Sequence, residues 1–268
     1  MILDEILAHK RQEVAERQAR RPLAALEADV AALPTALSGR FRDALRQPGV
    51  SFIAEIKRKS PSGGELRPGA SAADLAQMYA ANGAAALSVL TDLRYFGGTD
   101  ADLVSARETS GLPALRKDFV VDPYQLYEAR LIGADAILLI VRSLSDGELR
   151  ALLALSEQLG LDALVEAHSA DEVKRALEVG ARTVGVNNRD LDTLVTDVTL
   201  APRLRPLVPA ECVFVAESGI SQPDQITALR EAGVDAVLIG ETLVRAPDPG
   251  TRLRDFVAAG VQEHQVRV

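Results

Sequence analysis

The side chains in this sequence that can carry out acid–base chemistry gather directly after short apolar runs. Lysine, glutamate, asparagine and arginine follow six of these runs, in the segments EIKRKS, RKDF, VEAH, NNRD, AESG and GET. Only five of the 30 lysine and arginine residues are lysines, and three of these, Lys57, Lys59 and Lys117, stand at such positions. Lysine can lose its proton and arginine cannot, so the lysines in this arginine-rich chain are candidates for proton transfer.

Polar side chains also share faces of these runs. Side chains alternate along a strand, so Glu55 and Lys57 lie on one face, and His168 lies on the same side as Glu166. A lone histidine is more often a structural hydrogen-bonding group than a base. The charges could be solvated at a rim or could pair with one another. Pairing would not exclude catalysis, because clustered charges shift each other's pKa values.

Glycines after the last two apolar runs suit the binding of an anion. Ser218-Gly219 follows one run and Gly240-Glu241 follows the next, with a short helix expected over residues 241–245. Backbone N–H groups at a helix start bind anions, and barrels bind phosphate between these two loops. Each glycine could also serve only a tight turn. The loop at residues 60–64 is either a plain connector or a mobile lid that brings Ser60 to the phosphate.

Eight apolar runs must position these residues. They do not alternate with polar residues, as expected of parallel strands buried on both faces, and they cover residues 51–56, 84–90, 113–116, 136–141, 163–165, 183–186, 213–216 and 236–239. Helices are expected after them, over residues 72–81, 101–109, 124–131, 146–159, 170–179, 200–204, 223–232 and 250–258. The repeat length of about 25 residues predicts an α/β fold, a single (β/α)8 TIM barrel. A doubly wound open sheet is the alternative.

An N-terminal segment stands outside this repeat. The whole chain is expected to be one domain, with an N-terminal helical extension at residues 1–48, the barrel at 49–260 and a C-terminal tail at 261–268. Ile2, Ile6 and Leu7 give the first helix an apolar stripe that must pack on something. We expect it to pack beside the barrel mouth and to help enclose a substrate.

Composition limits the partners. The chain has 268 residues, 47% hydrophobic and 25% charged, as in ordinary globular proteins. A net charge of −8 argues against nucleic acid as a partner. One cysteine and three scattered histidines argue against a disulfide or a metal site. The N-terminus does not resemble a signal peptide, and the apolar runs are too short to span a membrane. We therefore expect a cytoplasmic monomer or weak homo-oligomer with a small-molecule substrate.

Six motifs in this order resemble the indole-3-glycerol phosphate synthase family. They are AEIKRKSPS (54–62), LRKDF (115–119), LVEAH (164–168), GVNNRDL (185–191), AESGI (216–220) and LIGETL (238–243), and the start, ILDEILAHKRQEV, is similar to that family's extra N-terminal helix. The resemblance covers essentially the whole chain. It implies a carboxy-lyase of tryptophan biosynthesis that converts 1-(2-carboxyphenylamino)-1-deoxyribulose 5-phosphate into indole-3-glycerol phosphate, with no metal or organic cofactor.

The resemblance also implies roles for individual residues. Lys117 would be the general acid on the ribulose carbonyl, and Glu166 the general base in the dehydration, with Asn187 orienting either Glu166 or the leaving hydroxyl. Lys57 would hold the substrate carboxylate and could also donate a proton, while Glu55 and Glu217 would tune the two lysines. The substrate-binding residues would be Arg189, Phe119, Leu138 and Leu191 for the anthranilate part, and Ser60, Ser218, Gly219, Gly240 and Glu241 for the phosphate.

Three other functions remain open from the residues. A class I aldolase also uses a lysine on a barrel strand, as a Schiff base. A phosphosugar-binding barrel could act as a scaffold without turnover. A phosphoribosylanthranilate isomerase resembles this fold and phosphate site, but it would lack the N-terminal extension and the set of two lysines with glutamate.

Overall fold

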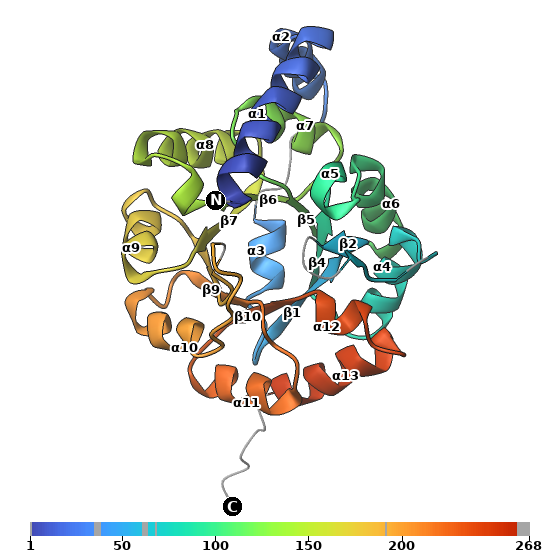
Figure 1. The fold of residues 1–268 in the computed structure, drawn as a ribbon, viewed down its shortest axis with the longest axis vertical. Coiled ribbons are helices and arrows are strands. Elements are labelled where there is room, and N and C mark those ends of the chain that lie inside the picture. The colour runs from blue at the N-terminus through green and yellow to red at the C-terminus, as the bar shows by residue number, and fades with distance from the viewer. Residues whose placement is uncertain (1, 35–38, 61–63, 68, 191, 262–268) are drawn as a thin grey trace, which may run out of the picture.

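Eight parallel strands form a closed barrel in the computed structural model, which describes residues 2–34, 39–60, 64–67, 69–190 and 192–261 (Figure 1). The strands lie around the barrel in the order β1-β10-β9-β8-β7-β6-β5-β4. Their bounds are β1 Ser51–Ile56, β4 Ala86–Leu90, β5 Ala114–Lys117, β6 Ala136–Ile140, β7 Asp162–Ala167, β8 Thr183–Asn187, β9 Val213–Glu217 and β10 Ala236–Ile239. The closed order confirms the predicted (β/α)8 barrel and excludes the open sheet.

The register of the strands brings their polar ends together. Most strand residues are buried, because one side of each strand faces the barrel interior and the other faces the helices. Lys117 at the end of β5 pairs with Leu90 of β4, and Asn187 at the end of β8 pairs with Glu217 of β9. The carboxyl ends of the strands therefore meet at one mouth, as in other barrels of this kind.

Helices cover the outside of the barrel. The eight expected helices are α4 Ala72–Ala81, α6 Asp100–Ser110, α7 Tyr124–Leu131, α8 Asp146–Gln158, α9 Ala170–Glu178, α10 Leu200–Leu204, α11 Pro223–Glu231 and α13 Pro249–Gly260. Several begin at capping side chains, such as Ser145 with Glu148 at α8. The short helix expected near residues 241–245 is α12, Glu241–Val244. A second short helix, α5 (Leu93–Phe96), and two 3₁₀ turns, η1 (Val141–Ser143) and η2 (Arg205–Leu207), are the remaining described helical elements that follow β1.

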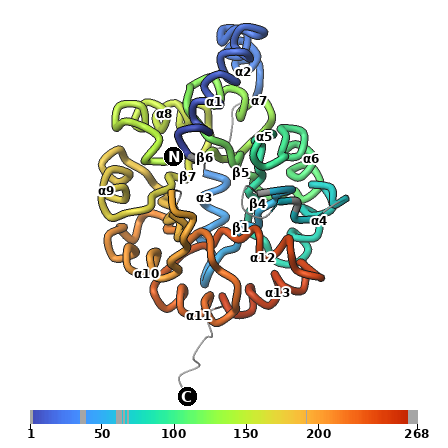
Figure 2. The backbone as a smooth tube through the Cα atoms, viewed as in Figure 1, coloured from blue at the N-terminus to red at the C-terminus, as the bar shows by residue number. Residues whose placement is uncertain are grey.

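Three helices precede the barrel: α1 (Ile2–Arg20), α2 (Leu23–Ala31) and α3 (Arg40–Ala44). Figure 2 shows α1 and α2 on one side of the barrel, next to α7. Val14, Leu26 and Tyr124 form a small apolar cluster there. The sequence did not predict α3, whose Phe41 is buried with Ile53 and Leu115 in the barrel interior. Asp162, at the start of β7, accepts hydrogen bonds from the first N–H groups of α3, so this helix closes the bottom of the barrel. The organisation of the N-terminal extension and the barrel as a single domain remains a prediction.

Two details differ from the sequence-based expectation or lie beyond it. The loop after β1 contains a small antiparallel pair, β2 (Lys59–Ser60) with β3 (Gly64–Glu65), which the sequence did not predict; residues 61–63 of the expected lid lie outside the described residues. Most of the expected tail, residues 262–268, also lies outside them. Among the described helices, none is both long enough and apolar enough to cross a membrane.

Candidate active site

A cavity of about 180 Å³ opens at the carboxyl ends of the strands. It lies where the sequence places the acid–base residues. Ten of the predicted site residues line it: Glu55, Lys57, Lys117, Phe119, Leu138, Glu166, Asn187, Arg189, Glu217 and Ser218. The strand ends thus bring together side chains that are up to about 160 positions apart in the chain.

Lys117 occupies the centre of the charged groups. Its Nζ lies 2.9 Å from Oε2 of Glu166 and 2.8 Å from Oε2 of Glu217. Both carboxylates are almost fully buried, whereas the lysine side chain keeps a small exposed fraction toward the cavity. Burial disfavours the charge of Lys117, but the surrounding carboxylates outweigh burial and hold its pKa above the ordinary value. The amine is therefore protonated at neutral pH.

The two carboxylates on Lys117 have different proton affinities. Burial raises the pKa of Glu217 to about 7, and the neighbouring charge of Glu166 adds to this effect. Burial also disfavours the charge of Glu166, but Lys117, His168 and the Asn187 amide hold its pKa well below the usual range. Near pH 7, Glu166 is therefore ionised, whereas Glu217 is partly protonated. Such a division of pKa values is how an acid and a base can work side by side.

Two glycines give these carboxylates their space. Lys57 lies 2.9 Å from Oε1 of Glu55, and a Cβ at Gly240 would overlap with that same oxygen. A Cβ at Gly185, in the middle of β8, would overlap with Oε1 of Glu217. The sequence predicts Gly240 as a phosphate-binding residue. The space that it leaves for the Glu55 carboxylate is a second role, which the sequence did not predict. The sequence analysis missed Gly185, although a glycine inside a strand often marks a close approach.

Asn187 and Arg189 follow β8 at the mouth. The Asn187 amide donates to Oε1 of Glu166 at 3.3 Å, and its own oxygen accepts from the backbone N–H of Arg189 at 3.1 Å. The Arg189 side chain contacts Thr196 Oγ1 at 3.4 Å. His168 lies on the other side of Glu166, with Nε2 at 3.4 Å from Oε1. This contact agrees with the expected shared face of Glu166 and His168.

An apolar wall faces the charged groups. The predicted Phe119 and Leu138 belong to it, and Leu191 lies outside the described residues. The wall also contains side chains that the sequence analysis did not assign to the site, namely Leu90, Phe96, Ile140, Leu194 and Leu238, together with Leu3 and Ile6 of α1. Phe96 and Phe119 lie with ring centroids 6.2 Å apart. Leu3 and Ile6 confirm that α1 packs beside the mouth, and its apolar stripe was the signal for it.

The predicted phosphate residues lie in the loops after β9 and β10. Ser218 and Gly219 have φ values of 65° and 78°, and the Asn188 amide holds the Ser218 carbonyl at 3.0 Å. Gly240 directly precedes α12. The Glu241 carboxylate accepts from Arg245 Nε at 2.8 Å. Of this group only Ser218 is among the cavity-lining residues, and the Ser60 side chain lies outside the described residues.

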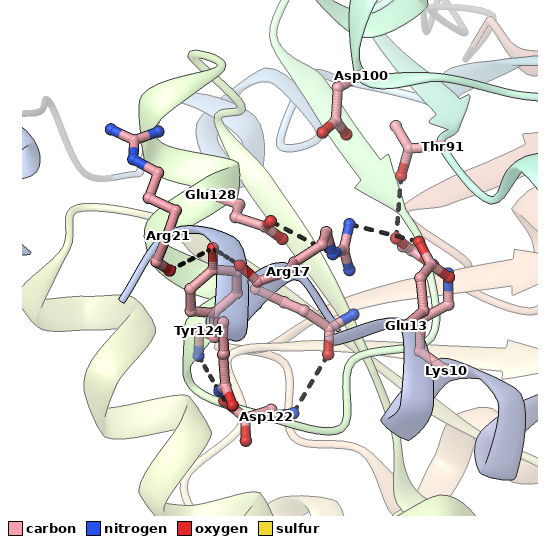
Figure 3. A network of polar contacts seen from close by, with 12 residues as sticks. Lys10, Glu13, Arg17, Arg21, Thr91, Asp100, Asp122, Tyr124 and Glu128 are labelled. Carbon is pink, nitrogen blue, oxygen red and sulfur yellow. Dashed lines mark hydrogen bonds and ion pairs between the residues drawn. The ribbon is translucent and has the colours of Figure 1, made fainter. Parts of the chain in front are cut away.

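A buried lysine fixes α1 to the strand ends. Lys10 has no exposed surface, and its Nζ lies 2.8 Å from Asp92, 3.0 Å from Asp118 and 2.8 Å from Glu13. Asp118 directly follows Lys117, and Asp92 caps the N-terminus of α5. Figure 3 shows Lys10 within a wider network that continues through Arg17 to Glu128. The network joins the N-terminal extension to the segment that carries Lys117.

Cations and carboxylates are mixed at the mouth. Three cations, Lys57, Lys117 and Arg189, line the cavity with the three carboxylates that the lysines contact. Asp118 also lines it, but Lys10 and Arg116 neutralise this carboxylate from behind. The two lysines of the cavity are therefore each paired with carboxylates. In the part of the chain that the structure describes, no three His, Cys, Asp or Glu side chains gather as a metal ion would require.

Comparison with known proteins gives one consistent family. The family model for indole-3-glycerol phosphate synthase matches residues 3–256. A protein of that name from Acidithiobacillus ferrooxidans is 50% identical over 255 residues, which cover 94% of this chain and 97% of the relative. A relative of the same name from Dehalococcoides mccartyi is 47% identical, over 96% of this chain and all of its own length.

Solved structures with a similar fold are much more distant in sequence. A thiamine phosphate pyrophosphorylase from Pyrococcus furiosus matches with a TM-score of 0.59 at 13% identity, over 80% of this chain and 96% of its own. KGPDC from Streptococcus mutans matches with a TM-score of 0.60 at 14% identity, over 79% of this chain and 97% of its own. At this identity the likeness concerns the barrel fold alone.

Proposed function

The chain belongs to the indole-3-glycerol phosphate synthase family, and we propose that the residues at its barrel mouth carry out that family's reaction. The reaction closes a pyrrole ring in 1-(2-carboxyphenylamino)-1-deoxyribulose 5-phosphate and releases carbon dioxide and water. It makes the protein a carboxy-lyase of tryptophan biosynthesis. The observation that carries the assignment of roles is Lys117, protonated and held between Glu166 and Glu217 at the wall of the cavity.

Lys117 is the general acid of the ring closure. A proton given to the ribulose carbonyl oxygen makes the carbonyl carbon electrophilic, and the aromatic carbon that bears the carboxylate then attacks it. Lys57 holds that carboxylate until it leaves as carbon dioxide, and Glu55 positions Lys57 at 2.9 Å. Glu217, with its pKa near 7, keeps a proton that can return to Lys117 after the transfer.

Glu166 is the general base of the dehydration. Its lowered pKa keeps the carboxylate ionised at neutral pH, so it is ready to accept a proton from the substrate as water leaves. Asn187 donates to the other oxygen of the same group and thereby fixes its direction. The base and the acid contact each other in the free protein, and a bound substrate would separate them.

The apolar wall and the loops after β9 and β10 bind different parts of the substrate. Phe119, Leu138 and Leu191 hold the anthranilate ring with Arg189, and the wall residues Leu3, Ile6, Phe96 and Leu194 extend that surface. The phosphate binds to the backbone of Gly219, Gly240 and Glu241 and to the hydroxyls of Ser60 and Ser218. Glu241 can serve only through its N–H group, because its carboxylate is turned to Arg245.

The test is an assay of the purified protein with the carboxyphenylamino substrate, followed by the growth of indole fluorescence. We expect turnover without added metal or cofactor. Binding without turnover would identify a scaffold. Covalent trapping of a lysine by borohydride in the presence of substrate would identify an aldolase instead. Turnover of phosphoribosylanthranilate in place of the carboxyphenylamino compound would identify the isomerase.

The setting of the reaction belongs to the same proposal. The substrate is small and anionic, so the protein needs no nucleic acid, membrane or protein partner to reach it. We place it in the cytoplasm, as a monomer or weak homo-oligomer. Light scattering across a range of protein concentrations tests the second statement, and a large, concentration-independent assembly would contradict it.

A further inference from the structure

His168 is the buried titratable group closest to the proposed base that the mechanism does not use. It directly follows β7, and its side chain is 2% exposed. Its Nε2 lies 3.4 Å from Oε1 of Glu166 as an ion-pair contact, but no group of the described residues, Glu166 included, makes a hydrogen bond to this nitrogen. A buried ring nitrogen that faces a carboxylate oxygen needs an explanation, because an unpaired polar group in that place is costly.

The opposite side of the ring is anchored. Nδ1 of His168 lies 3.3 Å from Oε2 of Glu172, on α9, and the same oxygen accepts the backbone N–H of His168 at 2.8 Å. Glu172 is itself held by Arg142 of η1, whose Nε lies 3.1 Å from Oε1. The imidazole thus stands between two carboxylates. A protonated imidazolium donates to both of them at once, whereas the neutral ring donates to only one.

We propose that His168 is a positioning residue for Glu166: its Nε2 donates to Oε1 of Glu166 and fixes that carboxylate, while Glu172 and Arg142 fix the ring. The inference rests on the proposed role of Glu166 as base. His168 acts beside Asn187, which donates to the same oxygen, and opposite Lys117, which binds Oε2. Two charged groups face the ring itself, Glu166 and Glu172. Each of these carboxylates contacts a cation in turn, Lys117 for Glu166 and Arg142 for Glu172.

Two substitutions separate this role from a structural one. The glutamine side-chain nitrogen can take the place of Nε2, whereas the asparagine nitrogen takes the place of Nδ1. His168→Gln therefore keeps the donor to Glu166 and loses the contact with Glu172, and His168→Asn does the reverse. We expect His168→Asn to lower kcat about tenfold with KM within about twofold, and His168→Gln to retain kcat within about threefold.

The pH profile is the readout that loop stability alone would not move. Without the donor, the pKa of Glu166 rises, since its ionised form loses support. The acid limb of kcat should then move to higher pH in His168→Asn and stay near that of the wild type in His168→Gln. His9→Asn, on α1, where the ring contacts Arg94 and Tyr95 and not Glu166, is the matched control and should leave kcat, KM and the profile unchanged. A larger loss in the glutamine variant, tracking a fall in Tm, would overturn the proposal.

A double-mutant cycle distinguishes a failure of this inference from a failure of the proposed base. In a Glu166→Gln background His168→Asn should cause no further loss of kcat, because it acts through Glu166. The same tenfold loss in both backgrounds would show that His168 acts elsewhere and overturn the inference. Near-normal kcat in Glu166→Gln alone would remove Glu166 as the base, and with it the premise for His168.

Discussion

Lys117 can serve either as a proton donor or as a fixed positive charge, and its two contacts at 2.8 and 2.9 Å suit both roles. Lys117→Arg separates them. The guanidinium keeps the charge and can still bridge Glu166 and Glu217, but its pKa above about 12 makes it a poor acid. General acid catalysis typically contributes about 10² to 10⁴ in rate. We expect kcat to fall at least about a hundredfold, about 2.7 kcal/mol of barrier, with KM much less affected.

Steady-state indole fluorescence measures both constants, and circular dichroism confirms that the variant is folded. If Lys117→Arg keeps near-normal kcat, Lys117 is a binding residue, and Lys57 becomes the candidate for the acid. Lys57→Arg is then the informative comparison, because Lys57 contacts only one carboxylate among the described residues, that of Glu55.

Glu217 makes a specific pH dependence expected near neutrality. Burial raises its pKa to about 7, so it loses its proton as the pH rises through that value. The added negative charge strengthens the hold on the Lys117 proton and repels an anionic substrate. Both effects lower kcat/KM on the alkaline side of about pH 7. In Glu217→Gln this alkaline fall of kcat/KM should be absent. The same fall in the wild type and in Glu217→Gln would show that another group causes it.

The sequence could predict the acid–base residues of the site because strand ends determine their position. Lys117, Glu166 and Glu217 each end a buried apolar run, and the barrel brings every such end to one mouth. Phe96 and Leu194 could not be found in the same way. They belong to a short helix and a loop, and only the packing of those segments turns them toward the cavity.

Among the elements, the strands and outer helices were predictable because each carries a pattern of its own. α3 carried none, since five residues are too few for a helical period to be visible. Its position depends on tertiary contacts, namely the burial of Phe41 in the barrel interior and the capping by Asp162. The β2–β3 pair is likewise too short to give a strand pattern.

Helix α1 depends on one buried charge. Lys10→Met would leave Asp92 buried without its cation and Asp118 with Arg116 alone, and removing one partner from a buried pair typically costs about 3–5 kcal/mol. We expect a lower Tm and, because Leu3 and Ile6 would leave the cavity wall, a higher KM with kcat nearly unchanged. Adding Asp118→Asn should restore part of the stability. A variant with wild-type Tm and KM would contradict the role of Lys10.

The cost of Lys10→Met should itself depend on pH. The charges of Lys10 and Arg116 outweigh burial and hold the pKa of Asp118 below its ordinary value. The ionised form of Asp118 is the one that binds Lys10. The stabilisation is therefore complete above the ordinary aspartate pKa of about 4 and is lost as the pH falls below it. Denaturant unfolding measures the free energy of unfolding of the wild type and of Lys10→Met. The difference between the two proteins should be large at pH 7 and small near pH 3.

For the whole molecule, a net charge of −8 surrounds a mouth in which the lysines are paired with carboxylates. An anionic substrate is therefore repelled at long range and held by specific contacts only after it arrives. At about 10 mM salt the repulsion extends about 30 Å, and at 100 mM about 10 Å. We expect kcat/KM to rise modestly, about twofold, when sodium chloride is raised over that range. Phosphate and sulfate salts must be avoided, because either anion would compete at the proposed phosphate site. A steep fall of kcat/KM with chloride would show that the mouth acts as a net positive site despite its paired carboxylates.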